Sequence, residues 1–387
     1  MWWPATAAVG IGNDVSDQRR IRRGMGDLLG SSGRLLLLAL GLSLACEAPD
    51  AGFRDGSPRD HLPDYITELT DLGAVVRPAW SADGSRFLYL DALVGNVFEF
   101  DVATRTSRPL TRHFEHHGFT RAHYLANGDV LLCGPAKIDS DDPERGRWRA
   151  DFWLLDAGLT KPARPLAERC FEGPAVARKS MRIAWVRTDL PDKMLTARSE
   201  LWTGLVDPNG DAPRIVEARK LADRSDLFYF GMFEPQDFRP PDEREVLFTA
   251  YAYRGGEAMG IDLETGEIVN YSRNRWYDEI EGVTPDGRFA LVEREFTQRL
   301  RPKGAIDLWL LRLDGSGDYT RLTHFSEFRG FGANNPVVSP DCRTLIFALR
   351  ETGGQEGNSA GLFLYDLTRS PLSPRDLCSR PDVHATG

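Results

Sequence analysis

A polar turn between two apolar, strand-like runs recurs along this chain, and this repeat constrains the fold more than any other feature. Its clearest copies are Ser81-Ala82-Asp83-Gly84, Thr284-Pro285-Asp286-Gly287 and Ser339-Pro340-Asp341-Cys342. The equivalent turn positions are Asp83, Asn127, Lys179, Asp242, Asp286 and Asp341. Successive positions lie 44 to 63 residues apart, a period typical of stacked supersecondary units.

Each copy of the repeat contains three or four short runs rich in Phe, Trp, Val and Leu, separated by turn residues. No segment beyond the apolar run at residues 35–45 shows helical periodicity over ten residues. One such sheet cannot bury both of its faces alone, whereas radial stacking lets each sheet cover its neighbours. The sequence therefore predicts an all-β fold, a six-bladed β-propeller of four-stranded antiparallel blades.

The order of elements within the repeat resembles the TolB-type propeller repeat. The turn is followed by an aliphatic strand, an aromatic strand that ends in Asp, and a strand that ends in Leu-Thr. The best copies are Ser81–Thr111, Thr284–Thr323 and Ser339–Leu367. TolB carries an α/β domain before its propeller, and residues 47–64 are too few for one. The resemblance therefore implies the propeller alone and not the role of TolB.

A propeller must close its ring, and two segments compete to complete the last blade. Tyr65-Ile66-Thr67-Glu68-Leu69-Thr70 reads like the outer strand Tyr319-Thr320-Arg321-Leu322-Thr323. We expect this N-terminal segment to pair with the strand near Leu362–Leu367. The rival is the tail segment Arg375-Asp376-Leu377-Cys378.

The N-terminal region indicates export and lipidation. Leu35 to Ala45 form a short apolar run after Arg34 and directly before Cys46, too short to span a bilayer but typical of a signal peptide. We expect residues 1–45 to be the signal peptide, with Met25 as a possible true start. The resemblance to bacterial lipoprotein signals implies that Cys46 is lipidated. Residues 46–64 are then a linker, residues 65–380 the propeller and residues 381–387 a tail.

Charge and cysteine content narrow the function classes. The formal net charge of −9 disfavours electrostatic binding to the phosphate backbone of nucleic acids. Apart from Cys46, the cysteines are Cys133, Cys170, Cys342 and Cys378, and they show no zinc-type spacing. One disulfide is possible in an oxidising envelope, although Cys133 reads as a small buried hydrophobe. The pairing stays open.

The loops between successive blades open on one face of a propeller, and five of them carry carboxylates. From these loops we predict a ligand-binding rim, whose candidate residues are Glu115, His116, Glu172, Glu234, Glu281, Glu327, Arg329 and Asn335. Converging charge around a low-dielectric opening attracts counter-ions. The alternative is ordinary solvated surface on an acidic protein.

Histidines supply the competing hypothesis. His113, His116 and His117 are close in sequence, and propeller-fold lyases use histidines and a metal in the funnel. Their spacing matches no tight metal-ligand motif. We expect a non-enzymatic binding or scaffolding protein that is monomeric and has no cofactor. We expect it to be an outer-membrane lipoprotein on the periplasmic side of the envelope, attached to the membrane only by its lipid. Its expected partner is an envelope protein or a cationic peptide segment. The alternative is a metal-dependent polysaccharide lyase or hydrolase with a divalent ion at these histidines.

Overall fold

The computed structural model describes residues 53–69, 72, 76–137, 148–189, 198–210, 212–227, 231–251, 253, 255–295, 306–351, 360–372 and 377–378. The chain divides into two units, Met1–Asp50 and Ala51–Gly387, and all the described residues belong to the second. Cys46 and the signal peptide lie outside the described residues. Among those that are described, no helix has the length and apolar character needed to cross a membrane.

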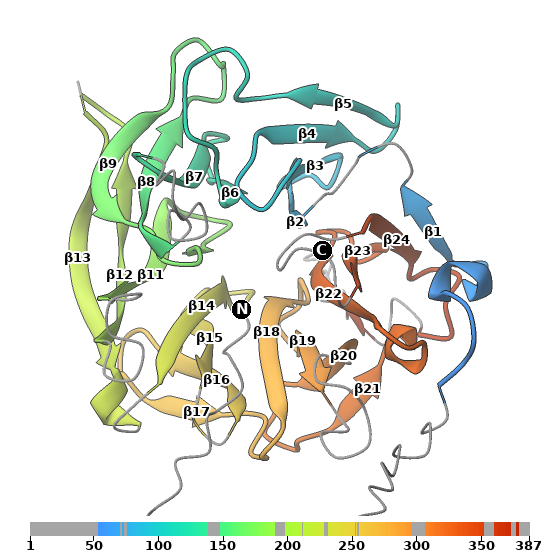
Figure 1. Cartoon of the computed structure of the whole chain (residues 1–387). Helices are drawn as coiled ribbons and strands as arrows, with labels where there is room; N and C mark the ends of the chain where they lie inside the picture. Colours follow the sequence, from blue (N-terminus) through green and yellow to red (C-terminus); the bar gives the residue numbers. More distant parts are fainter. Residues whose placement is uncertain are drawn as a thin grey trace, which may run out of the picture. The chain divides into compact units, whose positions relative to one another are not determined.

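The described chain is all-β apart from three short 3-10 turns at Pro58–His61, Arg224–Asp226 and Phe325–Glu327. Its strands form four separate four-stranded antiparallel sheets and one eight-stranded sheet. Figure 1 shows these sheets arranged around a common axis, with β2, β6, β14, β18 and β22 nearest the centre. This arrangement is that of a β-propeller.

The four separate sheets each take four strands in the order of the chain, except that the last takes its outer strand from the N-terminal side. Their strands are β2 (Val76–Trp80), β3 (Arg86–Leu90), β4 (Val97–Asp101), β5 (Thr106–Pro109); β6 (Arg121–Tyr124), β7 (Val130–Pro135), β8 (Ala150–Leu155), β9 (Arg164–Arg169); β10 (Ala175–Val176), β11 (Arg182–Thr188), β12 (Ser199–Asp207), β13 (Arg214–Asp223); and β22 (Phe331–Val338), β23 (Thr344–Glu351), β24 (Leu362–Asp366), β1 (Ile66–Leu69).

The eight-stranded sheet corrects the predicted fold. Its strands are β14 (Met232–Phe238), β15 (Glu245–Tyr251), β16 (Gly256–Asp262), β17 (Ile268–Asn270), β18 (Tyr277–Val283), β19 (Phe289–Glu295), β20 (Asp307–Arg312) and β21 (Tyr319–Arg321). A parallel pair between Gly256 and Tyr277 joins β16 to β18. The all-β class is confirmed, but the prediction of six four-stranded blades is wrong, because only four sheets have four strands and the other eight strands form one sheet.

Glycine permits this junction. Gly255 has a φ of +137°, and a Cβ there would lie 2.8 Å from the carbonyl oxygen of Trp276. A side chain at Gly256 would press on the ring of Tyr277, at 3.3 Å. The two backbones can therefore approach closely enough to pair, a contact that a repeat pattern does not encode.

The prediction for ring closure is confirmed. β1 pairs antiparallel with β24, with Ile66 opposite Tyr365 and Leu69 opposite Leu362. The rival tail does not supply this strand, although Leu377 is buried in the same core. Apolar layers between neighbouring sheets hold the ring together; one, for example, combines Leu88 and Leu90 with Val130 and Leu132.

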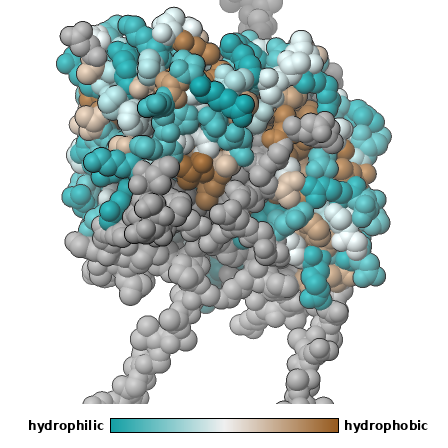
Figure 2. Space-filling view, turned by 45° about the horizontal axis from the view of Figure 1, so that its top comes forward, coloured by the Kyte–Doolittle hydropathy of each residue, from teal (hydrophilic) through white to brown (hydrophobic). Residues whose placement is uncertain are grey.

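Two disulfides connect the cysteines, Cys133 to Cys170 and Cys342 to Cys378. The reading of Cys133 as a free buried hydrophobe is therefore wrong, because its side chain is buried and also bonded. Hydrophilic residues cover most of the described part of the face drawn in Figure 2, with hydrophobic residues in small groups between them. That face offers no broad apolar docking surface among the described residues.

Candidate functional site

The inner strands surround a channel along the axis of the ring. At one end the channel widens into a cavity of about 430 Å³, lined by residues of β2, β6, β10, β14, β18 and β22 and of the turns that follow these strands. Deeper in, it narrows to a space of about 50 Å³. Because every inner strand contributes to the lining, residues far apart in sequence meet here.

A ring of polar side chains lines the narrow part of the channel. Each inner strand, or the loop directly before it, supplies one: Arg77, Arg121, Glu172, Gln236, Glu281 and Asn335. We call these six residues the polar ring. Such a convergence of hydrogen-bonding groups in a concave site is typical of ligand pockets.

Backbone irregularities coincide with the polar ring. The register of β2, β14, β18 and β22 shifts near Arg77, Gln236, Glu281 and Asn335 respectively. A bulge re-aims a side chain and is frequent beside functional sites. Arg77, Glu172 and Asn335 also have φ values of 59°, 56° and 49°. Such strained conformations in non-glycine residues cluster where function requires them.

Prolines provide the local cause. Pro78 follows Arg77 and Pro336 follows Asn335, and proline cannot donate to a sheet ladder, so it is confined to edge strands and bulges. The inner strands β2 and β22, which carry these prolines, are edge strands of their sheets. A polar residue directly before a proline therefore marks the channel in these repeats.

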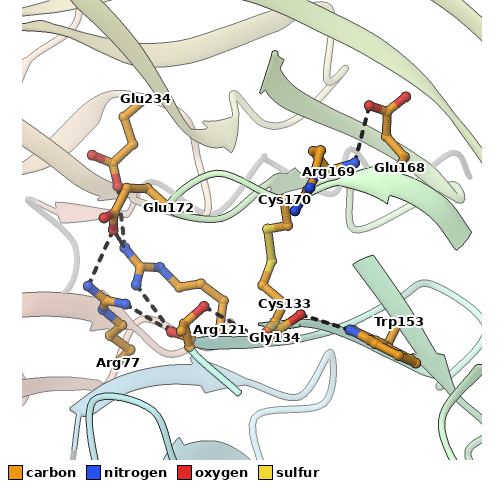
Figure 3. The surroundings of a disulfide bond; sticks show 11 residues. Arg77, Arg121, Cys133, Gly134, Trp153, Glu168, Arg169, Cys170, Glu172 and Glu234 are labelled. Carbon is orange, nitrogen blue, oxygen red and sulfur yellow. Dashed lines mark hydrogen bonds and ion pairs between the residues drawn. A yellow bond between two sulfur atoms is a disulfide. The ribbon is translucent and has the colours of Figure 1, made fainter. Parts of the chain in front are cut away.

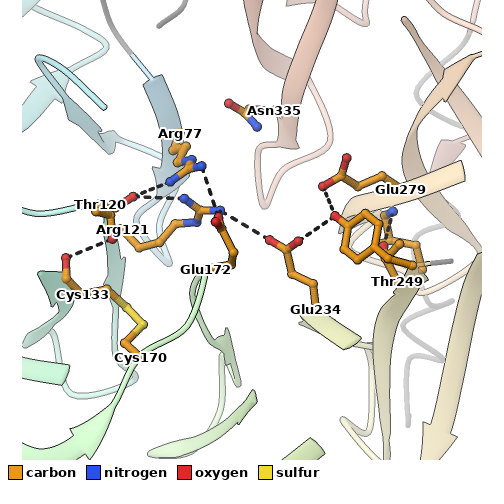
Figure 4. A network of polar contacts seen from close by, with 12 residues as sticks. Arg77, Thr120, Arg121, Cys133, Cys170, Glu172, Glu234, Thr249, Glu279 and Asn335 are labelled. Carbon is orange, nitrogen blue, oxygen red and sulfur yellow. Dashed lines mark hydrogen bonds and ion pairs between the residues drawn. A yellow bond between two sulfur atoms is a disulfide. The ribbon is translucent and has the colours of Figure 1, made fainter. Parts of the chain in front are cut away.

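Two arginines and two glutamates form an ion-pair chain across one side of the channel (Figures 3 and 4). An Arg121 amino group lies 2.8 Å from Glu172 Oε2 and 3.4 Å from Glu234 Oε1. Arg77 lies 3.4 Å from the same Glu172 oxygen. Glu172 and Glu234 are 4% and 3% exposed, so removing one partner would leave a buried charge unpaired.

The first disulfide and a glycine hold this chain in place. Cys170 lies two residues before Glu172, and Cys133 pairs across the sheet with Arg121, so the bond ties the Glu172 segment to the strand beside Arg121 (Figure 3). Gly173 has a φ of +129°, and a Cβ there would lie 2.9 Å from Arg121 Cγ. A side chain at position 173 would therefore displace Arg121 from its present position.

Tyr251 continues the network beyond Glu234. Its hydroxyl lies 2.6 Å from Glu234 Oε2 and is also hydrogen-bonded to Glu279; Figure 4 labels both glutamates. Tyr277 donates to the other oxygen of Glu279. The Tyr251 hydroxyl has one hydrogen to donate, so one of its two carboxyl contacts requires a proton on the acid. Burial, with the charges of Glu172 and Glu279, raises the pKa of Glu234 to about 7 against the pull of Arg121.

Three carboxyl groups gather next to this point. One oxygen from each of Glu279, Glu281 and Glu293 lies within 4.8 Å of the others, close enough to hold a metal ion. We call these three residues the carboxylate cluster. Burial and the nearby Glu279 charge raise the pKa of Glu293 to about 7. Burial and the neighbouring glutamates raise the pKa of Glu281 well above its usual range. A positive charge here would relieve their repulsion.

The structure divides the predicted rim into two groups. Glu172, Glu281 and Asn335 belong to the polar ring, and Glu234 contacts it through Arg121. These acids lie inside the channel and not on a rim. The other four predicted residues do not line it.

Those four residues lie on loops outside the channel lining. Glu115 is exposed, and His116 accepts a hydrogen bond from the backbone of Gly118. Glu327 forms ion pairs with Arg321 and His324, and Arg329 lies over the ring of Phe53.

The histidines of the alternative hypothesis also lie away from the channel lining. His113 and His117 are exposed, and among the described residues His113, His116 and His117 take part in no cluster with metal-ligand spacing. His123 does line the channel. Burial and the Arg121 charge lower its pKa to about 4, so it is neutral at pH 7.

Sequence reasoning missed Arg77, Arg121, Tyr251, Tyr277 and Glu293 as channel residues. Arg77 carries the signal of a polar residue before a proline, which Glu234 and Asn335 share. Tyr251 and Glu293 lie on second strands of their sheets, β15 and β19. Their approach to the channel depends on sheet geometry and has no local signal.

Fold and channel together define the molecule as an all-β propeller with a polar channel that is lined by both acidic and basic side chains. The sequence matches no protein-family model and no curated protein. Similar solved structures include TolB from Acinetobacter baumannii, with a TM-score of 0.47 and 11% identity over 66% of this chain and 56% of that one. An oligogalacturonate lyase in complex with manganese has a TM-score of 0.49 and 12% identity, over 78% and 92% of the two chains.

A gluconolactonase from Xanthomonas campestris is similar to the same degree, with a TM-score of 0.47 and 14% identity over 78% of this chain and 89% of that one. At these values the likeness extends to the architecture at most. It gives this chain neither an activity nor a ligand.

Proposed function

We propose that this protein is a binding propeller whose channel accepts a positively charged group of its partner at the carboxylate cluster. The observation that carries the proposal is the close approach of Glu279, Glu281 and Glu293, of which Glu281 lines the channel. In the described part of the chain none of these three residues forms an ion pair with a lysine or arginine. Their shared negative charge is therefore available to a ligand.

The channel sets the size of the group that enters. A cavity of about 430 Å³ accommodates a few side chains and excludes a folded domain. Glu281 borders both the wide and the narrow part of the channel, so a group in either part can reach it. A peptide segment that presents a lysine or arginine fits this description.

The cellular setting forms part of the same proposal. Two disulfides suit an oxidising compartment, and the apolar run before Cys46 suits export with a lipid anchor. We place the protein on the periplasmic side of a bacterial envelope, where its partner is another envelope protein or a segment of one.

Calorimetric titration with defined cationic probes tests the proposal. A tetralysine peptide and spermidine should bind the wild-type protein, more weakly as salt is raised. Glu281→Gln should weaken that binding at least tenfold, because it removes one charge from the cluster and keeps the shape. Glu115→Gln removes the same charge from an exposed residue outside the channel and should leave the affinity unchanged.

Two results would count against the proposal. If neither probe binds, the cluster does not serve organic cations. If Glu281→Gln and Glu115→Gln weaken binding equally, the attraction is a general effect of net charge. Stoichiometric metal in the purified protein, lost in Glu281→Gln, would make a metal ion the occupant.

A further inference from the structure

The junction within the eight-stranded sheet brings two carboxylates together, apart from the carboxylate cluster of the channel. Gly256 of β16 pairs in parallel with Tyr277 of β18. The next residue on each strand is Glu257 and Asp278, which therefore lie side by side. Both are fully buried, at 0% exposure.

The loop between the two strands holds one oxygen of each carboxylate. Glu257 Oε2 accepts from the Ser272 hydroxyl at 2.5 Å and from the backbone N–H of Asn274 at 3.3 Å. The Asn274 side chain donates to Asp278 Oδ2 at 2.6 Å. Asn274 thus fixes the separation of the two acids.

The second oxygen of each acid lacks such support. Glu257 Oε1 and Asp278 Oδ1 are buried and have no hydrogen-bond partner among the described residues. Leaving a buried polar atom without a partner costs about 1–3 kcal/mol, and more for a charged group. For Glu257 Oε1, which has no ion pair among the described residues either, this cost indicates that another group satisfies it.

One positive charge lies nearby and does not suffice for both acids. Arg294 Nε lies 3.4 Å from Asp278 Oδ1, and the guanidinium lies over the Tyr319 ring at 3.6 Å. Arg294 balances Asp278. No ion pair of Glu257 occurs within the described residues, so one negative charge remains in the interior, where an unbalanced charge is costly.

We propose that Glu257 and Asp278 bind a hard metal cation of the calcium type at the junction of β16 and β18. Carboxylate oxygens are the ligands that such ions prefer, and Glu257 Oε1 has neither a hydrogen bond nor an ion pair among the described residues. The ion would supply the positive charge that Glu257 lacks and link the two halves of the eight-stranded sheet. This site is independent of the proposed channel function.

Thermal unfolding of the intact protein tests the proposal. Protein stripped with a chelator should gain Tm in a saturable manner as calcium is added, with separate titrations of sodium and potassium to identify the ion. Glu257→Gln should abolish the gain, because it removes the charge and keeps the shape. Glu264→Gln, at an exposed position in the turn between β16 and β17, should retain it.

Each other outcome would overturn the inference. A Tm that responds to none of the ions, or equally in wild type and Glu257→Gln, means that no ion binds here. A response lost in Glu281→Gln but kept in Glu257→Gln places the ion in the channel. A gain of stability on acidification without a response to metal means that a proton, and not a metal ion, neutralises the buried charge of Glu257. If Glu257→Gln does not fold, Asp278→Asn and the metal stoichiometry of the wild type decide the matter.

Discussion

At the scale of single residues, the channel is defined by acids that the fold forces together. Glu234 contacts Arg121 and Tyr251, and Glu293 accepts from the backbone N–H of Asn335 at 2.7 Å. These contacts orient the carboxyl groups, while burial opposes their ionisation. The fold therefore preorganises these carboxyl groups at some cost in stability, as is common at functional sites.

Stability should depend on pH through these acids. The pKa of Glu234 is raised from 4.5 to about 7, so the folded state takes up a proton as pH falls below 8, while the unfolded state stays ionised. The free energy of unfolding should therefore rise as pH falls from 8 to 6.5. For an isolated group with this pKa shift, the full change from the ionised to the protonated form raises the free energy of unfolding by about 3 kcal/mol. A histidine that is neutral in the folded state, such as His123, opposes the rise toward the lower end of this window, because its pKa in the unfolded chain is about 6.5.

Glu234→Gln should reduce the slope of that rise, measured by urea denaturation across the same pH range. Glu293 keeps part of it, because its pKa is also raised to about 7. Equal slopes for the wild type and Glu234→Gln would contradict the assignment.

Gly173 should tolerate no side chain. Gly173→Ala combines a left-handed backbone with a contact on Arg121, and we expect a loss of about 1–3 kcal/mol in unfolding free energy. Gly210→Ala is the control, since Gly210 has a φ of +81° with nothing within 4 Å. It should show the backbone strain without the displacement of Arg121. If both variants lose the same stability, the contact is unimportant.

At the scale of elements, the repeat predicted much of the fold and the loops predicted only part of the site. The Asp83, Asp286 and Asp341 turns precede second strands as expected. Closure by β1 could be predicted from the sequence, because residues 65–70 resemble the outer strand at residues 319–323. The joining of β16 to β18 in one sheet could not be predicted, because the parallel pair between Gly256 and Tyr277 depends on how closely the two backbones pack.

The predicted rim shows the same limit. Glu172 and Glu115 both follow an outer strand, yet only Glu172 enters the channel. A disulfide and a left-handed backbone set the direction of Glu172, and neither could be deduced from the loop composition. Position in a repeat predicts which end of the ring a residue occupies, but not its depth in the channel.

Ring closure by β1 can be tested with side-chain truncation. Ile66 and Leu69 are buried against the last sheet, and Thr67 between them is exposed. Ile66→Ala and Leu69→Ala should each lower the unfolding free energy by about 2–4 kcal/mol. Thr67→Ala should change it by no more than about 0.5 kcal/mol. Similar values for all three variants would mean that β1 contributes little to closure.

At the scale of the whole molecule, the proposed lipid anchor at Cys46 would hold a ring with a polar channel in the envelope. The proposed export would account for the disulfides, and the anchor would keep the protein at the membrane, where partners in the envelope could reach it. The ring brings its loops together, and the bulged inner strands turn polar side chains inward. Binding specificity then resides in the channel and depends little on the outer surface.

The anchor should depend on one residue. Cys46→Ala should move the protein from the membrane fraction to the soluble fraction, because lipid attachment requires the thiol. Membranes washed with high salt remove proteins held by charge alone. A variant that still sediments after the wash would show that Cys46 does not anchor the chain.

The decisive measurement for cation binding in the channel is a crystal structure of the wild-type protein with a bound tetralysine peptide. An ammonium group should lie in the channel, within hydrogen-bonding distance of Glu281 and of Glu279 or Glu293. An ammonium group bound instead at Glu115 or Glu327, with none in the channel, would contradict it.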